Sequence, residues 1–388
     1  MLRVLTLATL FPHAAAPNLG VFVERQTLGL AAHRDIDLRV VAPVGLPPWP
    51  LSRHGHYAPL ARLPTREPWK GLDVRRPRFL TLPGTAGRFH VPALVRALAP
   101  LLADIRRDFP FDVIDAEFFF PDGPAAVALG KALGVPVSIK ARGADIHHWG
   151  TAPATAAQVI AAGRQADGVL AVSQAMRADM TALGIPAETI RVHHTGVDLD
   201  RFAPRDRTGA KAKFGVTGPL VVSVGALIPR KGHDVVIDAV AAIPGASLLI
   251  AGAGAARPTL EAKIAALGIG DRVRLLGALP HADLPALIAA ADVMALASAS
   301  EGLANAWVEA LACGTPIVIT DAGGAREVVT DVAYGRVVAR EANAFTRAIG
   351  EVLAAPPMQE AVRKGAERFT WSANTDALYA HLRNLVSA

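Results

Sequence analysis

Short apolar runs alternate with segments of helical periodicity along the whole chain. The runs are rich in Val, Ile and Leu and lie at Val4–Leu7, Leu38–Val41, Val113–Ile114, Val137–Ile139, Val169–Val172, Leu220–Val224, Leu248–Ile250, Val273–Leu276, Val293–Ala297 and Ile317–Ile319. Near-continuous apolar strands separated by helices are typical of parallel sheets that are covered on both faces. The pattern therefore predicts an α/β protein in which this arrangement occurs twice.

A polar stretch divides the two sets of strands. Residues 198–204 contain three charged side chains and a proline and come before the fresh strand at Leu220, so we predict a linker over 199–218. The length of 388 residues also favours two domains. We expect a first domain over 1–198 and a second over 199–370, with a last helix over 371–388 that packs back on the first. Residues 45–90 are rich in Pro and Gly and are predicted to form long loops.

The single cysteine and the N-terminal apolar run both argue for a protein of the reducing cytoplasm. Cys313 is the single cysteine and lies within an apolar run, so we expect a buried, inert thiol and no disulfide. The run Val4–Leu10 resembles a signal peptide, but one positive charge precedes it, and the periodic stretch Leu19–Ala32 needs a strand to pack on. No run approaches the roughly 20 apolar residues of a membrane span. We expect a cytoplasmic protein.

The net charge is +6 and the isoelectric point is about 9.8, with 40 Lys or Arg against 34 Asp or Glu. Much of the excess lies in the segment Pro50–Pro110, which holds eleven basic and four acidic residues. A solvated basic face and a surface for anionic lipid or a phosphorylated acceptor both fit this segment. Nucleic acid is not an expected partner, because no zinc-finger, RNP or helix-turn-helix pattern accompanies the charge.

The stretch Ser298–Pro316 carries the strongest chemical signal. It runs from a strand end through a Gly turn into a helix, an arrangement that offers backbone N–H groups and a positive dipole end to a phosphate. Glu301 lies just before this helix, and Glu309 lies about two turns inside it on roughly the same side. Carboxylates accept hydrogen bonds from the neighbouring hydroxyls of sugars and riboses. A capping Glu and an unrelated surface Glu are the alternative interpretation of this spacing.

Several motifs together resemble the retaining glycosyltransferase family 4 ("group 1") enzymes. The paired Glu301 and Glu309 are followed by Ala310–Pro316 and, after a strand, by Asp321–Glu327, and together these look like the family signature. The other similar stretches are Ser223–His233, Val172–Gln174, Thr195–Phe202 and Leu10–Glu24. Pro121–Gly123 and Ala141–Ile146 resemble a branch that includes teichuronic-acid and other surface-polysaccharide transferases.

This resemblance implies a GT-B fold, with two Rossmann-like domains whose parallel sheets face each other across a cleft. It implies transfer of a hexose, with retention of configuration, from a UDP- or GDP-linked sugar to a glycan, glycolipid or lipid-linked acceptor in surface polysaccharide or glycolipid biosynthesis. Glu301 would bind the donor sugar, Glu309 the ribose, and Lys231 the departing diphosphate. The other implied donor contacts are Gly20, Gly225, Arg230, Gly302, Leu303, Ala304 and Asn305. No cofactor and no metal ion are expected.

The chain departs from the family pattern at three positions. Ala226 replaces an arginine after the glycine of the diphosphate loop, and Ala304 replaces a glycine whose left-handed backbone would cost alanine about 1 kcal/mol. Arg142 stands where many members have His, and it is followed by Asp145. Arginine does not accept a proton at neutral pH, so we expect Arg142 and Asp145 to serve the acceptor side of the reaction by orienting a phosphate or sugar.

Two other functions remain to be compared with this one. A dinucleotide-dependent oxidoreductase is disfavoured, because Gly252–Arg257 lacks the third glycine of the fingerprint. A catalytically degenerate nucleotide-sugar-binding partner subunit is the alternative that Ala226 and Ala304 motivate.

The adjacent His147 and His148 match no metal-ligand spacing and are expected to be structural. The basic segment 50–110 is the predicted contact with the inner face of the plasma membrane, and Arg75, Arg76 and Arg78, near Trp69 and Phe79, are its predicted lipid-binding cluster.

Overall fold

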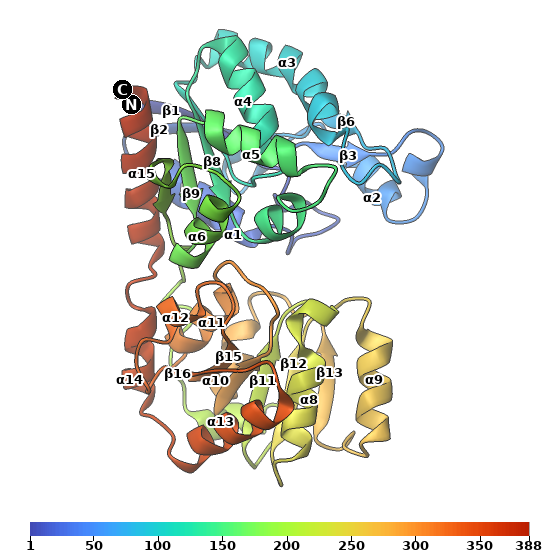
Figure 1. Ribbon diagram of the computed structural model, residues 1–388, viewed down its shortest axis with the longest axis vertical. Helices are drawn as coiled ribbons and strands as arrows, with labels where there is room; N and C mark the ends of the chain where they lie inside the picture. Colours follow the sequence, from blue (N-terminus) through green and yellow to red (C-terminus); the bar gives the residue numbers. More distant parts are fainter. Residues whose placement is uncertain (388) are drawn as a thin grey trace. The chain divides into compact units, whose positions relative to one another are not determined.

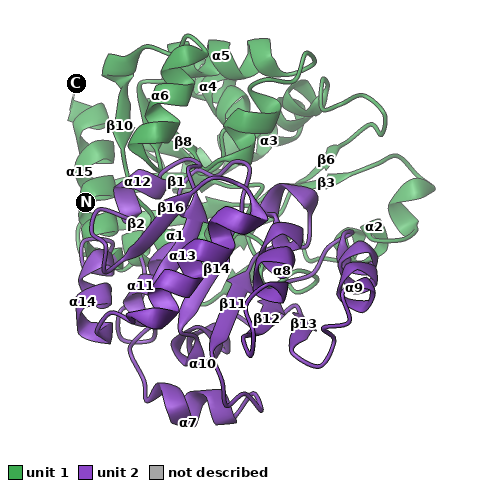
Figure 2. Cartoon of the chain, turned by 60° about the horizontal axis from the view of Figure 1, so that its bottom comes forward, with its two compact units in different colours: residues 1–196, 371–388 green, residues 197–370 purple. Residues whose placement is uncertain are grey.

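The computed structural model describes residues 1–387 and divides the chain into two compact units. The first unit comprises Met1–Gly196 together with the helix that begins at Trp371, and the second comprises Val197–Thr370 (Figure 2). The last helix, α15 (Trp371–Ser387), packs against α1 (Val21–Ala31) of the first unit (Figure 1). The boundary between the units falls two residues before the predicted one.

An eight-stranded sheet forms the centre of the first unit. Its order is β10 (Ile190–Val192), β9 (Gly168–Ala171), β8 (Val137–Ala141), β7 (Val113–Ala116), β1 (Leu2–Leu7), β2 (Ile36–Val41), β5 (Leu72–Arg75) and β4 (Arg66–Trp69). All neighbours are parallel except β4 and β5. Strands β7, β8 and β9 are buried throughout, as expected for strands covered on both faces.

Helices cover both faces of this sheet. Helices α1 and α15 lie on one face, and α3 (His90–Asp108), α4 (Asp122–Leu133) and α5 (Ala156–Gln165) lie on the other (Figure 1). The remaining helices of the unit are α2 (Tyr57–Ala61), α6 (Gln174–Ala182) and the short turns Leu51–Arg53, Asp145–Trp149 and Ala187–Thr189.

The second unit has a six-stranded, fully parallel sheet. Its order is β13 (Val273–Gly277), β12 (Ser247–Ala251), β11 (Leu220–Val224), β14 (Val293–Leu296), β15 (Ile317–Thr320) and β16 (Gly335–Val338). Alternate residues of the central strands enter separate apolar clusters: Val221 and Ile250 belong to one, and Val222 and Leu249 to the other. This alternation is the period of a strand buried on both faces.

The helices of the second unit follow the strands in regular βα order. They are α7 (Arg207–Ala212), α8 (His233–Ala241), α9 (Arg257–Ala266), α10 (Leu284–Ala290), α11 (Asn305–Ala312), α12 (Ala325–Val328), α13 (Ala342–Ala354) and α14 (Gln359–Arg363), with short turns at Pro229–Lys231 and Lys364–Ala366. The predicted α/β architecture with two parallel sheets is confirmed.

Two segments differ from their predicted structure. Residues 45–90 are not only loops, because they contain β4, β5 and the parallel pair β3 (Val44–Leu46) and β6 (Arg78–Leu80). The β4–β5 hairpin turns through Lys70 and Gly71, both at positive φ, as a two-residue turn of the primed type requires. The predicted linker contains α7, whose first turn is capped by the Asp206 carboxylate, an acceptor for the N–H groups of Thr208 and Gly209.

Candidate active site

The loop that follows β11 brings Lys231 to the carboxyl end of the second sheet. Gly232, at φ 66°, begins helix α8, and a Cβ at this position would lie 2.0 Å from the Ala297 carbonyl oxygen. The close approach places the loop beside the end of β14, and the Ala299 N–H donates to the Arg230 carbonyl at 2.8 Å. Glycine is therefore required at 232, both for its left-handed backbone and for the packing.

Lys231, Arg230 and Glu301 form one charged cluster. The Lys231 ammonium donates to Glu301 Oε1 at 2.5 Å, and the Arg230 guanidinium lies 3.7 Å from Glu301 Oε2 and bonds to the Ser300 carbonyl. The Lys231 and Glu301 side chains are 15% and 8% exposed. Gly225 lies beside them, since a Cβ there would be 3.6 Å from Lys231 Cδ. Two cations against one carboxylate leave a positive site that suits a phosphate group.

The loop after Glu301 is held from behind by a second glycine turn. Gly323, at φ 53°, lies so close that a Cβ would be 2.2 Å from the Glu301 carbonyl oxygen, and the Gly324 N–H donates to the Gly302 carbonyl at 2.8 Å. Leu303 is buried, and Ala304 has φ −71° and ψ 118°. The left-handed backbone considered for Ala304 is therefore absent, and alanine at this position is not strained. Asn305 begins α11, whose N-terminus has no side-chain cap.

Glu309 has a partner of its own inside α11. Its carboxylate is nearly buried, and its Oε1 lies 2.7 Å from Nε2 of His281. The His281 ring stands edge-on to Phe202 at a centroid distance of 5.4 Å. His281 could not be selected from the sequence, because a single His in the loop after β13 matches no motif. The structure pairs it with one of the two carboxylates that the motif predicts.

In the first unit, Asp145 is bound by the main chain. Its fully buried carboxylate accepts the N–H groups of Arg142 at 3.0 Å, Gly143 at 2.7 Å and Phe119 at 3.0 Å. Burial raises the pKa of Asp145 although these N–H groups oppose the shift. The arrangement favours a positioning role for Asp145, in which it shapes the loop after β8, over the direct orientation of a phosphate or sugar that the sequence predicts.

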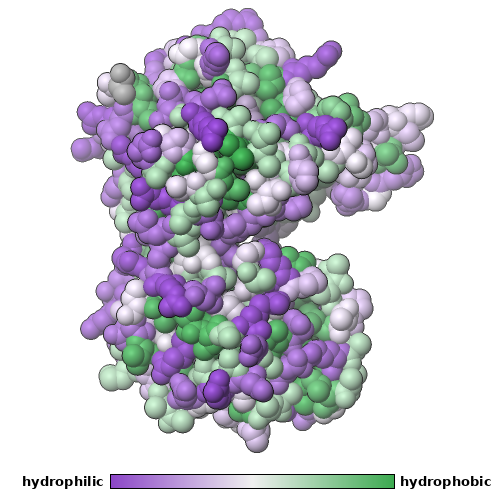
Figure 3. Space-filling view, in the orientation of Figure 1, coloured by the Kyte–Doolittle hydropathy of each residue, from purple (hydrophilic) through white to green (hydrophobic). Residues whose placement is uncertain are grey.

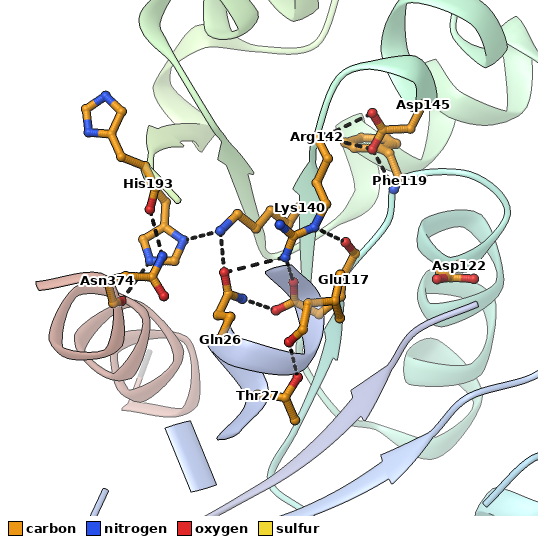
Figure 4. Close-up of polar contacts among 12 residues, drawn as sticks. Gln26, Thr27, Glu117, Phe119, Asp122, Lys140, Arg142, Asp145, His193 and Asn374 are labelled. Carbon is orange, nitrogen blue, oxygen red and sulfur yellow. Dashed lines mark hydrogen bonds and ion pairs between the residues drawn. The ribbon is translucent and has the colours of Figure 1, made fainter. Parts of the chain in front are cut away.

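Arg142 is also engaged within the fold. Its guanidinium forms an ion pair with the Glu117 carboxylate, and its Nε donates to the Glu117 carbonyl at 2.7 Å (Figure 4). The side chain is 10% exposed. A guanidinium that is held in this way has little freedom to move. Its small exposed surface is compatible with orienting an anionic or hydroxyl group, which stays a prediction.

A buried polar network that the sequence did not reveal surrounds Arg142. The Lys140 ammonium contacts Gln26 Oε1 at 2.5 Å and His193 Nδ1 at 2.8 Å, while the Gln26 amide reaches Glu117 (Figure 4). Burial, with Arg142 nearby, lowers the pKa of Lys140 to about 7. Burial and Lys140 also hold the pKa of His193 well below its usual value. The network joins β8, α1 and the run into the linker.

Two acidic side chains lie beside this network. Burial and the neighbouring Glu117 raise the pKa of Asp115 well above its usual value. Burial would also raise the pKa of Glu117, but Arg142 and Lys140 outweigh it and lower that pKa. Asp122, at the start of α4, is fully buried and accepts the Thr9 N–H at 2.8 Å; burial raises its pKa to about 7.

Gly20, the remaining predicted donor contact, begins α1 with φ 64°. A Cβ at this position would lie 2.2 Å from the Leu10 carbonyl oxygen. Glycine is therefore needed where the first loop folds back on the start of α1. The structure gives Gly20 this conformational role, and its contact with a donor stays a prediction.

Within the basic segment, the three arginines predicted to bind lipid are less exposed than expected. Arg76 is 1% exposed, is paired with Glu67 at 2.5 Å and donates to the Pro12 carbonyl at 2.7 Å. Arg78 donates to the Arg76 and Leu63 carbonyls, and burial followed by repulsion from Arg76 lowers its pKa. Arg76 is buried, and Arg75 and Arg78 are half-buried, so these three arginines do not form the exposed cationic patch that the sequence suggested.

A cavity of about 230 Å³ in the first unit is lined in part by Arg76. Its lining is mainly apolar and aromatic, with two histidines and one arginine among the polar members. The walls include Phe11, His13, Val44, Leu60, Arg76 and Phe79. Burial lowers the pKa of His13 and that of His90, which also lines the cavity. Neutral imidazoles and apolar walls suit an amphiphilic or sugar-like ligand.

Two residues judged structural from the sequence, His147 and Cys313, have surroundings that fit this interpretation. His147 Nε2 lies 2.9 Å from the Asp179 carboxylate. Cys313 is buried, and burial raises the pKa of its thiol to about 12, which leaves it inert at neutral pH. Within residues 1–387, no helix is long and apolar enough to cross a bilayer.

Family comparisons match each unit separately. Residues 19–201 match the family described as Glycosyltransferase Family 4, and residues 205–369 match Glycosyl transferases group 1. The chain carries the two domains of a GT-B glycosyltransferase. The second of these domains contains Lys231, Glu301 and Glu309, and the first contains Arg142.

The chain is also similar to individual glycosyltransferases. The D-inositol 3-phosphate glycosyltransferase of Mycobacterium tuberculosis is 38% identical over 217 residues, which cover 52% of this chain and 45% of that protein. The same identity and coverage hold for the Mycobacterium bovis enzyme. The chain thus spans about half the length of the curated relatives it matches.

Solved structures confirm the fold over the whole chain. Sucrose-phosphate synthase from Thermosynechococcus elongatus has a TM-score of 0.81 at 21% identity and is matched over 100% of both chains. Anabaena HepE in complex with UDP-glucose has a TM-score of 0.73 at 21% identity, with 99% of this chain and 100% of that chain covered. At this identity the likeness shows the GT-B fold alone.

Proposed function

We propose that this chain is a retaining glycosyltransferase that transfers a hexose from a UDP- or GDP-linked sugar. The acceptor would be a glycan, glycolipid or lipid-linked sugar used in making a surface polysaccharide or glycolipid. The observation that carries the proposal is the Lys231–Arg230–Glu301 cluster at the carboxyl edge of the second sheet. Ligands of open α/β sheets bind at this edge.

The cluster suggests how the donor is bound. Lys231 would exchange its Glu301 partner for the diphosphate, and Arg230 would supply the second positive charge that Ala226 does not. Glu301, released from Lys231, would accept hydrogen bonds from hydroxyls of the sugar. Glu309 would hold the ribose, with His281 fixing the orientation of its carboxylate. Two preorganised cations can stabilise the leaving diphosphate without a metal ion.

The reaction follows from these roles. The bond between the anomeric carbon and the diphosphate oxygen breaks, and the acceptor hydroxyl forms the new glycosidic bond on the same face. The departing phosphate takes the acceptor proton, so no enzymic nucleophile is required. Arg142, held by Glu117 and by the loop that Asp145 shapes, would orient the acceptor. We place this reaction in the cytoplasm, with the first unit touching the inner face of the plasma membrane.

The relatives support a nucleotide-sugar donor. One of the structurally similar proteins, Anabaena HepE, was solved with UDP-glucose, and another relative is a glycosyltransferase that acts on D-inositol 3-phosphate. Neither fact assigns the donor or acceptor of this chain. They justify testing UDP-sugars first.

A thermal-shift panel of UDP-, GDP- and ADP-sugars tests the donor. A donor that binds the folded protein raises the free energy of unfolding by about 2.7 kcal/mol at a hundredfold excess over Kd, and the melting midpoint rises with it. The donor that stabilises the protein is then incubated with it, and release of the hexose is followed by proton NMR of the anomeric signal. Release of the same anomer as in the donor supports a retaining reaction.

Two results would contradict the proposal. If no nucleotide sugar raised the midpoint, the donor site would be wrong. If a donor bound but neither hydrolysis nor transfer occurred with any tested glycan or glycolipid, the degenerate binding subunit would be the better description.

A further inference from the structure

Exposed apolar side chains gather on one part of the first unit. Within residues 1–387, nine large apolar side chains are exposed, and four of them are Trp49, Leu51, Leu80 and Phe89. Trp49 is 75% exposed. Single exposed apolar residues are normal, but several together mark a surface for a partner or a membrane.

The topology brings these four side chains to the same region. Strands β3 and β6 are parallel neighbours with Leu46 opposite Leu80, and the Thr81 N–H donates to the Leu46 carbonyl at 2.8 Å. The two strands therefore end side by side. Trp49 and Leu51 follow the end of β3, and Leu80 is the last residue of β6. Phe89 begins α3, which contacts β6.

This part of the unit projects from the side of the sheet. In Figures 1 and 2, β3, β6 and α2 extend away from the helices that cover the sheet faces. Figure 3, drawn in the orientation of Figure 1, shows apolar and polar residues mixed on this projection. An amphipathic projection is what an interfacial surface requires.

The charges around the apolar side chains have one sign. No Asp or Glu occurs between Asp37 and Glu67, or between Asp73 and Asp104. Arg53, Arg62 and Arg88 are exposed within these stretches. The positive charge is therefore not neutralised locally, and it is complementary to an anionic surface.

We propose that Trp49, Leu51, Leu80 and Phe89, with Arg53, Arg62 and Arg88, form a docking surface for an anionic lipid membrane. The apolar side chains would sit among the headgroups, where Trp is favoured, and the arginines would contact lipid phosphates. The elements of this docking surface also line the cavity, through Val44, Leu60 and Phe79. Membrane binding by this docking surface does not depend on the proposed function. Only its interpretation does, namely that it brings a lipid-linked acceptor to that cavity.

Vesicle co-sedimentation of the full chain tests the docking surface. We expect binding to phosphatidylcholine vesicles that contain phosphatidylglycerol, weaker binding to phosphatidylcholine alone, and release at raised salt by screening. Changing Arg53, Arg62 and Arg88 together to Gln should weaken binding by about a hundredfold, since each arginine near the surface contributes about fivefold. Trp49→Ala with Leu51→Ala should weaken it by at least about tenfold.

Matched controls come from the second unit. Met358→Ala with Leu267→Ala removes two exposed apolar side chains, 74% and 43% exposed against 75% and 51% for Trp49 and Leu51, and Arg347→Gln removes an exposed charge. All should bind vesicles as wild type does. Brominated lipid should quench tryptophan fluorescence in the wild type and much less in Trp49→Phe.

Three outcomes would overturn the docking surface. They are equal, negligible binding to both kinds of vesicle, undiminished binding by the variants, and equal quenching in Trp49→Phe. If the surface variants instead lost a copurifying protein while wild type ignored vesicles, the occupant would be a protein. Nucleotide titration of the same variants separates this proposal from the proposed function, because the donor site lies in the other unit.

Discussion

Replacing Lys231 by Met removes the cation that is closest to Glu301 while keeping most of the side-chain volume. In the folded protein the ammonium is 2.5 Å from the carboxylate, and both side chains are mostly buried. A hydrogen bond to a charged group contributes about 1.5–3 kcal/mol. If Lys231 makes one such contact with the diphosphate in the transition state, kcat/KM should fall by about 10- to 150-fold.

The assay is donor consumption at several donor concentrations, with Lys263→Met as the matched control. Lys263 also pairs with a carboxylate, Asp238, at 2.6 Å in the same unit, but it lies on α9, away from the Glu301 loop. Lys263→Met should retain wild-type kcat/KM. Melting midpoints of both variants show whether they are folded at the assay temperature.

The reasoning would be refuted by wild-type kcat/KM in folded Lys231→Met. It would also be refuted if both lysine variants lost activity equally, because that would indicate a general effect of lost ion pairs. A loss confined to KM would place the contact in donor binding rather than in the transition state.

Three further predictions concern Glu301, the need for a metal ion, and Asp122. Glu301→Gln should lower turnover more than it weakens binding of the free nucleoside diphosphate, because the carboxylate is proposed to bind the sugar; equal losses in kcat and nucleotide affinity would contradict this. Activity should persist in excess EDTA, since Lys231 and Arg230 supply the positive charge; loss that Mg²⁺ or Mn²⁺ restores would show a metal requirement. Asp122 has a folded pKa of about 7 against 3.8 in the unfolded chain, so the stability from its bound proton is present at low pH and is lost as pH rises through about 7. The free energy of unfolding of wild type relative to Asp122→Asn should therefore fall between about pH 5 and pH 8 in urea titrations; the same difference at both pH values would mean that Asp122 is ionised throughout.

The strands that form the two sheets were predictable because they are buried on both faces. Such strands are runs of Val, Ile and Leu, and each predicted run overlaps a strand of the structure. The short strands β4 and β5 were missed, because their exposed positions carry charges and a proline and give no continuous apolar signal. Strand β16 was missed for a related reason: its sequence, Gly335–Val338, begins with a glycine and an arginine and leaves only two consecutive apolar residues.

The contact between Lys231 and Glu301 was predictable because each residue lies in a contiguous motif. Lys231 and Glu301, 70 residues apart, were expected in one site and do contact each other. The partners that the sequence did not reveal are isolated polar residues. Lys140 lies within an apolar strand and His281 within an ordinary loop, so only the tertiary structure shows that they meet Gln26, His193 and Glu309.

The arginines Arg75, Arg76 and Arg78 show where prediction from the sequence fails. A run of basic residues suggested an exposed patch, but Arg76, the residue directly after β5, is buried and pairs with Glu67. Charge density in a sequence does not distinguish a solvated face from internal ion pairs. The exposed apolar side chains around it could be recognised only from the structure.

Calorimetric titration of a free nucleoside diphosphate into the protein tests the central proposal most directly. The nucleotide is the one whose sugar raises the melting midpoint, and the variants are Glu309→Gln and the control Glu261→Gln, whose carboxylate is about half exposed and pairs with Arg257 on α9. We expect wild type and Glu261→Gln to bind alike and Glu309→Gln to bind at least about tenfold more weakly, the loss of one hydrogen-bonded charge. No binding to wild type, or equal binding by wild type and Glu309→Gln, would contradict a nucleotide-sugar site at this carboxylate.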